Sequence, residues 1–247
     1  TYFNRADIPV GVVKASNPNF NCPRLWAEGI IAKYPHAIQS NYEAWDALKL
    51  YRKILSKQPD SSVTIVTVGT FTNLSNLLNS QPDEYSPLTG KQLIIKKVKQ
   101  LVSMAVAIDS SANSGYESNV MGDIPAAQNI IHNWPTPITL SGFEIGVNIF
   151  TGRSLIHNTS INNSPIKDAY QIALAYDGST EGRYSWDQTA VLVAVRGIDP
   201  YFNYRKLNFE IKDDGKDSVI AGDRITYLKA KYKPEEIGKI IEELMLR

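Results

Sequence analysis

Residues 63–74 read VTIVTVGTFTNL, and this stretch indicates the fold more clearly than any other in the 247-residue chain. Residues 63–68 form a near-continuous apolar run, which is typical of a strand buried on both faces of a parallel sheet. Gly69 then permits a sharp turn, and Thr72 stands where it can cap a following helix. Such a strand and turn would present main-chain groups at the carboxyl edge of a sheet, where α/β proteins place ligands, although the same turn also serves structure alone.

Outward from this stretch, strand patterns alternate with helix patterns along the chain. Further strands are expected at residues 8–13 and 101–108, with a weaker one at 136–141. Helices are expected at residues 41–57, 73–78, 123–133, 166–176, 187–195 and 234–246. The alternation predicts an α/β fold with a Rossmann-like, mainly parallel sheet flanked by helices. Residues 203–223 are expected to form peripheral strands or a hairpin, and residues 158–164 a surface loop.

Composition and charge exclude several classes of protein. A net charge of +1 gives no electrostatic reason to expect nucleic acid or an anionic membrane as a partner. No run approaches the roughly 18 to 20 apolar residues of a membrane span. Cys22 is the single cysteine, so no disulfide can form within the chain. The compartment stays open between the cytoplasm and the periplasm or secretion, and a homo-oligomer is compatible with the sequence.

Two clusters of polar residues are candidates for chemistry. In residues 117–123 (ESNVMGD), Glu117 and Asn119 stand two apart and would project to one side of an extended segment, where they suit sugar hydroxyls. The alternative is a solvated loop, and Asp123 more simply caps the next helix. In the second cluster, Asp187 precedes an apolar helix pattern. It could be a helix N-cap, or an oxygen ligand for a hard cation such as Ca²⁺.

Other catalytic motifs are missing from the sequence. The three histidines lie in no metal-binding or triad spacing, and no GxGxxG or GxxxxGK[ST] motif occurs. Nucleotide cofactor binding by those routes is therefore not expected.

Five segments in order resemble the inosine-uridine preferring nucleoside hydrolase family over the chain to about residue 196. The family's RTDIPV compares with RADIPV at residues 5–10, and its VPxGPLTN with VTVGTFTN at 66–73. Its ExNxxxDPEAA compares with ESNVMGDIPAA at 117–127, and its PITMVGLDVT with PITLSGFEIG at 137–146. Its HDPLAV compares with WDQTAV at 186–191.

This resemblance implies a calcium-dependent enzyme that hydrolyses the N-glycosidic bond of ribonucleosides, with a small-molecule nucleoside as substrate. It implies that the carbonyl oxygen of Val68 and the carboxylate of Asp187 bind Ca²⁺. It further implies that Glu117, Asn119, Met104 and Asn113 form the ribose-binding set, with Ser111 as the alternative to Asn113. The transition state would be oxocarbenium-like, which polar groups around the ribose must stabilise.

The sequence departs from the family pattern at two places. The family's opening motif, DTDxGxDDAxAL, supplies further metal-binding aspartates and the presumed catalytic base, and it does not occur here. We expect residues 1–247 to be one hydrolase-like domain lacking the family's first strand and helix; a derivative that lost catalysis is the alternative. Trp186 stands where many members have a His, and resembles the purine-preferring subgroup, in which an aromatic ring stacks on the leaving base. Trp186 could equally fill space beside the site.

These observations predict hydrolysis of ribonucleosides, with purine nucleosides preferred. Two alternatives stay open at this stage: a catalytically inactive sugar- or nucleoside-binding protein on the same scaffold, and a hydrolase of another glycoside. The region after about residue 200 indicates no function.

Overall fold

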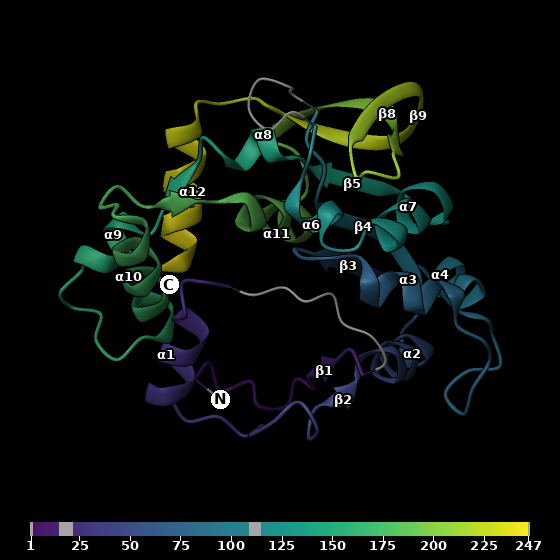
Figure 1. Ribbon diagram of the computed structural model, residues 1–247, viewed down its shortest axis with the longest axis horizontal. Coiled ribbons are helices and arrows are strands. Elements are labelled where there is room, and N and C mark those ends of the chain that lie inside the picture. Colours follow the sequence, from purple (N-terminus) through teal and green to yellow (C-terminus); the bar gives the residue numbers. More distant parts are fainter. Residues whose placement is uncertain (1, 15–21, 109–114, 247) are drawn as a thin grey trace.

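The computed structural model describes residues 2–14, 22–108 and 115–246 and shows a central sheet between two sets of helices (Figure 1). The five strands of this sheet lie in the order β3-β4-β5-β9-β8. Neighbouring strands are parallel from β3 to β9, and β8 is antiparallel to β9. The expected α/β fold with a mainly parallel sheet is therefore confirmed. The strand bounds are β3 Val63–Thr67, β4 Val98–Met104, β5 Ile138–Ser141, β8 Phe202–Ile211 and β9 Asp217–Ala230.

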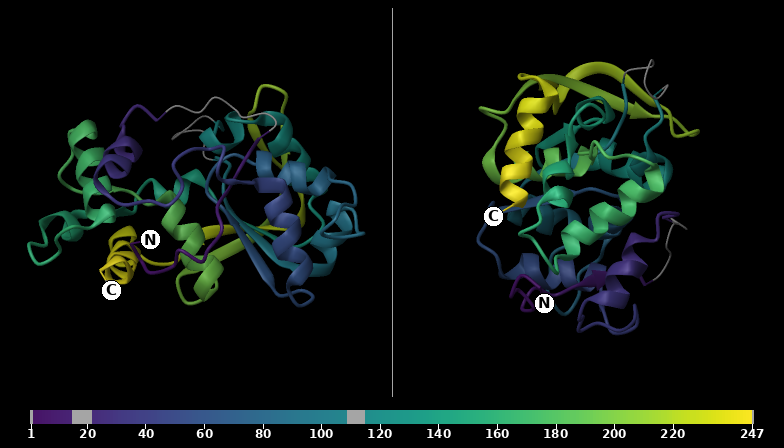
Figure 2. Two further views of the ribbon diagram at one scale, coloured as in Figure 1. Left: turned by 90° about the horizontal axis from the view of Figure 1, so that it is seen from below. Right: turned by 90° about the vertical axis from the view of Figure 1, so that its left-hand side faces the viewer.

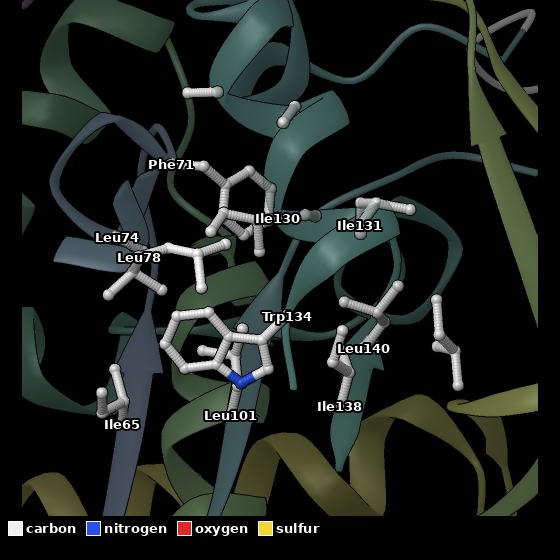
Figure 3. Close-up of a cluster of buried hydrophobic side chains, with 14 of the residues drawn as sticks. Ile65, Phe71, Leu74, Leu78, Leu101, Ile130, Ile131, Trp134, Ile138 and Leu140 are labelled. Carbon is white, nitrogen blue, oxygen red and sulfur yellow. The ribbon is translucent and has the colours of Figure 1, made fainter. Parts of the chain in front are cut away.

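Two hydrophobic clusters cover the two faces of the sheet, because successive residues of a strand point to opposite faces. Leu101 belongs to the cluster that includes Phe71, Ile130 and Trp134, and Figure 3 shows these side chains together. Val102 belongs to the other cluster. The helices beside the first face are α2 Ala47–Lys57, α3 Thr72–Asn79, α4 Gly90–Lys97 and α7 Ile124–Asn133. Those at the second face are α8 Phe143–Gly146, α11 Trp186–Arg196 and α12 Pro234–Met245 (Figure 2).

The remaining elements are short or lie at one end of the molecule. Helix α1 packs against α10, and β1 pairs with β2 in a separate two-stranded sheet. Their bounds are β1 Gly11–Val12, α1 Trp26–Lys33, β2 Trp45–Asp46, α6 Ser118–Met121, β6 Phe150–Thr151, α9 Arg153–His157, α10 Pro165–Asp177 and β7 Arg183–Tyr184. Within the described ranges, no helix is both long and apolar enough to pass through a membrane.

One expectation about the strands was wrong, and another was confirmed only in part. Residues 8–13 were expected to form a buried strand, but only Gly11–Val12 is a strand, outside the central sheet, and Ile8 and Val10 are each 53% exposed. The strands near residues 203–223 were expected to be peripheral; β8 is indeed the edge strand, but β9 continues into the sheet and lies between β5 and β8. The reason is that the apolar residues of β9 that face the core, such as Ile225 and Leu228, follow the range in which the hairpin was expected. The expectation of one domain over residues 1–247 stays a prediction.

Of the two neighbouring helices α3 and α7, only α7 begins with the side-chain cap that the sequence predicted. Asp123 caps α7, as expected, because its Oδ1 accepts a hydrogen bond from the Ala126 amide at 3.2 Å. Thr72 was expected to cap α3, but Phe71 occupies that position and Thr72 lies inside the helix. The Thr72 hydroxyl donates instead to Asp123 Oδ2 at 2.5 Å, which joins the starts of α3 and α7.

Candidate active site

The carboxyl end of β4 carries an unusual main-chain conformation. Val106 has a φ of 68° and is fully buried. The left-handed region is unfavourable for a β-branched side chain and costs about 1–3 kcal/mol, so it persists where neighbours hold it in place. The Val106 carbonyl accepts a hydrogen bond from the Phe143 amide at 2.9 Å. The Val106 amide lies close enough to the Glu117 carboxylate to lower its pKa.

Glu117 is buried rather than solvated, so the loop interpretation of this residue was wrong. Its side chain is at the N-cap of α6, where Oε2 accepts hydrogen bonds from the amides of Asn119 at 2.9 Å and Val120 at 3.3 Å. Only 3% of the residue is exposed. Burial raises the pKa of Glu117 to about 7, against the lowering effect of its main-chain partners, and the charge of Asp187 adds to the rise. Glu117 and Asp187 therefore lie near enough to interact electrostatically.

Asn119 links Glu117 to Met104, because it contacts both residues. The Asn119 Nδ2 donates to the Met104 carbonyl at 3.0 Å and approaches its Sδ at 3.2 Å. An extended segment was expected to bring Glu117 and Asn119 to one side, but only Glu117 is extended, since Asn119 lies in α6. The start of the helix, rather than strand geometry, brings the two side chains together.

Trp186 and Asp187 open α11. Ser185 is the N-cap, so Asp187 lies in the first turn and does not cap the helix, contrary to the simpler interpretation. Partial desolvation raises the pKa of Asp187, and the charge of the nearby Arg183 opposes this rise. The residue Asp187 is nevertheless exposed to solvent. The Trp186 Nε1 donates to the Phe143 carbonyl at 2.9 Å, which fixes the indole. A side chain at Gly146 would collide with the main chain of Trp186, so this close approach requires glycine.

Trp186 and Asp187 line a pocket of about 290 Å³ with residues that the sequence did not indicate. Tyr184 stacks at a tilt against Trp186, with ring centroids 4.8 Å apart, and Trp26 lines the same pocket from α1. Tyr184 lies two residues before Trp186, so its position in the sequence could have indicated that it belongs to the site. Trp26 gave no such signal.

Ion pairs and hydrogen bonds to α10 place Trp26 beside the pocket. Arg24 Nε lies 2.8 Å from Asp177 Oδ1, and the Tyr34 hydroxyl donates to Asp168 Oδ2 at 2.8 Å. These contacts flank α1 on both sides and hold it against α10, which itself lines the pocket. A residue distant in sequence thus joins the site through contacts that no local pattern reveals.

The other expected metal ligand is the carbonyl oxygen of Val68, which lies after β3. Val68 follows β3 directly and is 42% exposed, so its carbonyl lies at the carboxyl edge of the sheet. Helix α11 packs against β3. The meeting of the Val68 carbonyl with Asp187 stays a prediction, and Asn113 and Ser111 lie outside the described residues.

The fit of these residues to Ca²⁺ is partial. A carbonyl and a carboxylate are the kind of oxygen ligand that Ca²⁺ takes, but the ion needs about six to eight of them. Across residues 2–14, 22–108 and 115–246, no group of three or more His, Cys, Asp or Glu side chains is arranged to hold a metal. The described residues thus account for part of a calcium site at most.

Two further carboxylates that the sequence analysis did not select reach the end of β4, Asp217 and Glu144. Asp217, the first residue of β9, is 5% exposed, and its Oδ2 accepts from the Ala107 amide at 2.7 Å. Burial, with the charges of Glu117 and Glu144, raises the pKa of Asp217 to about 8. Glu144 Oε1 accepts from the Ile108 amide at 2.5 Å, and its Oε2 accepts from the Tyr227 hydroxyl. Burial raises the pKa of Tyr227.

A parallel sheet with buried polar side chains at its carboxyl edge, beside an aromatic pocket, defines an α/β protein of the kind that binds small polar ligands there. The family model described as inosine-uridine preferring nucleoside hydrolase matches residues 5–240. The chain therefore belongs to this family, which makes it an N-glycosyl hydrolase of the nucleoside hydrolase type. No curated protein sequence matches the chain.

Solved structures show the same fold at low sequence identity. A plant nucleoside hydrolase is 19% identical with a TM-score of 0.72, and the match covers 97% of this chain and 80% of that one. A purine-preferring ribonucleoside hydrolase from Gardnerella vaginalis is 15% identical with a TM-score of 0.67, covering 94% and 77%. An inosine-uridine preferring nucleoside hydrolase from Bacillus anthracis is 16% identical with a TM-score of 0.66, covering 96% and 79%.

Proposed function

We propose that the protein hydrolyses the N-glycosidic bond of purine ribonucleosides, with the ribose bound at Glu117 and Asn119 and the base beside Trp186. The charge of Asp187 contributes to the raised pKa of Glu117. The observation that carries this proposal is the packing of α11, which begins with Trp186 and Asp187, against β4. It joins the buried polar cluster at the end of β4 to the aromatic pocket at the start of α11, as a substrate with a sugar and a base requires.

The ribose half of the substrate suits the polar cluster. The amide group of Asn119 is oriented by its bonds from Nδ2 to Met104, and no hydrogen bond to its Oδ1 occurs among the described residues. That oxygen can accept from a sugar hydroxyl, as the ionised Glu117 can. With a pKa of about 7, Glu117 is ionised in a growing fraction of molecules as the pH rises above neutrality. Negative charge here also stabilises an oxocarbenium-like transition state.

The base half suits the pocket. The indole of Trp186 is held by its bond to the Phe143 carbonyl, so it offers a fixed aromatic face. Tyr184 and Trp26 line the same pocket and enlarge the aromatic surface. A purine has a larger ring system than a pyrimidine and gains more from such surfaces. The similarity of the fold to a purine-preferring ribonucleoside hydrolase from Gardnerella vaginalis supports the same choice.

We also propose that Ca²⁺ assists the reaction, with the Val68 carbonyl and the Asp187 carboxylate among its ligands. When bound, the ion would orient the ribose hydroxyls and increase the acidity of a water molecule. The other ligands and the general base are not assigned to any described residue. The described residues themselves bind the ribose, fix the aromatic surface and stabilise positive charge.

The test is release of free base and ribose from inosine, guanosine and uridine, with calcium present or removed by a chelator. We expect purine nucleosides to be hydrolysed faster than uridine, and the rate to fall when calcium is removed. Glu117→Gln should lower kcat/KM by roughly 10- to 100-fold, because it removes a charged hydrogen-bond acceptor worth about 1.5–3 kcal/mol. Absence of turnover with every nucleoside, or unchanged turnover in Glu117→Gln, would reject the proposal.

A further inference from the structure

Three consecutive main-chain amides after β4 each interact with a different carboxylate. The Val106 amide lies close enough to the Glu117 carboxylate to lower its pKa. The Ala107 amide donates to Asp217 Oδ2 at 2.7 Å, and the Ile108 amide donates to Glu144 Oε1 at 2.5 Å. The proposed function uses only the first of these carboxylates. The second comes from β9, more than a hundred residues away in sequence, and bonds the amide next to the partner of Glu117.

The bond to Asp217 fixes the orientation of the peptide group between Val106 and Ala107. The carbonyl of this group accepts from the Phe143 amide at 2.9 Å, and its N–H donates to Asp217. Because a peptide group is planar, holding both ends sets the ψ angle of Val106. The left-handed conformation of Val106, with φ at 68°, therefore depends on this pair of bonds. The Val106 amide, on the other side of the same α-carbon, interacts with the Glu117 carboxylate.

The main chain of Asp217 holds the segment that leads into Glu117. Its amide donates to the Gly115 carbonyl at 2.7 Å, and the adjacent residues Tyr116 and Lys216 form an isolated antiparallel bridge. Gly115 has a φ of +80°, which favours glycine. Asp217 therefore contacts two segments beside Glu117. Its side chain bonds the Ala107 amide, next to Val106, and its main chain bonds Gly115, two residues before Glu117.

We propose that Asp217 is a positioning residue for the ribose site, which holds Glu117 in its binding orientation by fixing the Val106–Ala107 peptide group. This inference rests on the proposed function, in which Glu117 binds ribose. Asp217 is 95% buried and acts on the substrate only through Glu117, so its loss should weaken ribose binding rather than remove a reacting group.

Two substitutions at Asp217 separate this role from general stability. Asp217→Ala removes the acceptor for the Ala107 amide but leaves the main-chain bond to Gly115. Asp217→Asn keeps an oxygen acceptor. We expect Asp217→Ala to raise the KM for inosine roughly tenfold with little change in kcat, and Asp217→Asn to return KM to within about threefold of the wild type, in the range seen for groups that orient a binding residue.

The matched control is Asp46→Ala. Asp46 Oδ1 accepts from the Lys49 amide at 3.0 Å and caps α2, so this change removes the same kind of carboxylate–amide bond on an element far from β9 (Figure 1). We expect Asp46→Ala to lower the melting temperature and leave KM unchanged. A KM in Asp217→Ala equal to that in Asp46→Ala would overturn the proposal, as would an Asp217→Asn variant as impaired as Asp217→Ala.

A double-mutant cycle tests whether Asp217 acts through Glu117. If it does, adding Asp217→Ala to Glu117→Gln should change kcat/KM far less than the same substitution does in the wild type. Independent, additive losses would overturn the proposal, because they would show that Asp217 influences binding by another route.

Hydrogen exchange of the amides at Val106 and Ala107 gives a readout that needs no turnover. We expect both amides to exchange faster in Asp217→Ala than in the wild type and to be unchanged in Asp46→Ala. Unchanged exchange in Asp217→Ala would overturn the positioning role. If the wild type hydrolyses no nucleoside, the proposed function fails on that result, and exchange together with titration of ribose still decides whether Asp217 positions Glu117.

Discussion

At the end of β4 the polar groups of the candidate site are held by the protein, whereas the start of α11 presents aromatic faces and a carboxylate to an open pocket. Glu117 accepts from the main-chain amides of Asn119 and Val120, and the Asn119 side chain donates to Met104. Around the pocket, Trp26 and Tyr184 are 42% and 40% exposed. Among the described residues, Asp187 makes no hydrogen bond that would hold its carboxylate in one place.

This difference suggests how the two halves of a nucleoside are distinguished. Fixed acceptors recognise a sugar by the direction of its hydroxyls, because a misplaced hydroxyl leaves a buried polar group unpaired. Aromatic faces recognise a base by area and stacking, which tolerates different ring substituents. Changes at the end of β4 should therefore affect all ribonucleosides alike, and changes in the pocket should alter the ranking of bases.

The largest effect is expected at the junction of the two regions. Asp187→Ala should reduce kcat/KM for inosine and guanosine by at least about 10²–10³-fold, because it removes the carboxylate that we propose binds Ca²⁺ and stabilises positive charge on the ribose. Initial rates in saturating calcium measure this. Asp60→Ala, which removes an exposed carboxylate paired with Lys97, is the control and should retain normal turnover. Normal turnover in Asp187→Ala would remove the metal assignment.

A smaller effect, confined to the base, is expected in the pocket. Trp186→Ala should slow hydrolysis of inosine roughly three- to tenfold, from the loss of stacking worth about 0.5–1.5 kcal/mol, and should affect p-nitrophenyl riboside much less. The p-nitrophenolate leaving group departs without being protonated, so hydrolysis of this substrate does not depend on an aromatic ring stacked on the leaving group. Trp45→Ala, which removes an exposed indole outside the pocket, should leave the ratio of the two rates unchanged. Equal losses on both substrates would argue that Trp186 only fills space.

The smallest effect concerns stability and pH at the end of β4. The pKa of Asp217 rises from 3.8 to about 8 in the folded protein, so between these values the folded state binds more protons than the unfolded state. The stability contribution of this group is therefore present below about pH 4 and lost as the pH rises through about 8. Glu117 acts in the same direction between 4.5 and about 7.

Thermal unfolding measured from pH 5 to pH 8 checks this sign. We expect the melting temperature of the wild type to fall over this range, and to fall less steeply in Asp217→Asn, which cannot ionise. Asp123→Asn, at a capping carboxylate outside this cluster, should retain the steep dependence. A wild-type melting temperature that rises with pH would contradict the assigned direction of both pKa shifts.

Local patterns predicted elements well where the reason was local. The buried run before Gly69 forms β3, and the pattern at residues 123–133 forms α7 with Asp123 as its cap. The motif predicted that Glu117 and Asn119 lie together, and they do, since the Glu117 carboxylate accepts from the Asn119 amide while the Asn119 side chain bonds Met104. Their role in binding stays a prediction. The reason given for their proximity was wrong, because it assumed an extended segment where a helix begins.

The sequence by itself determined the alternation of strands and helices, the parallel sheet and the family, since each follows from periodicity or from short motifs in fixed order. Only the tertiary structure decided that Asp217 supports the amides beside Glu117, and that Trp26 lines the pocket of Trp186. Both depend on contacts between residues more than a hundred positions apart, and a pairing across a folded core leaves no trace in the local sequence around either partner. The partners become neighbours only after the sheet places β9 beside β5 and α1 docks against α10.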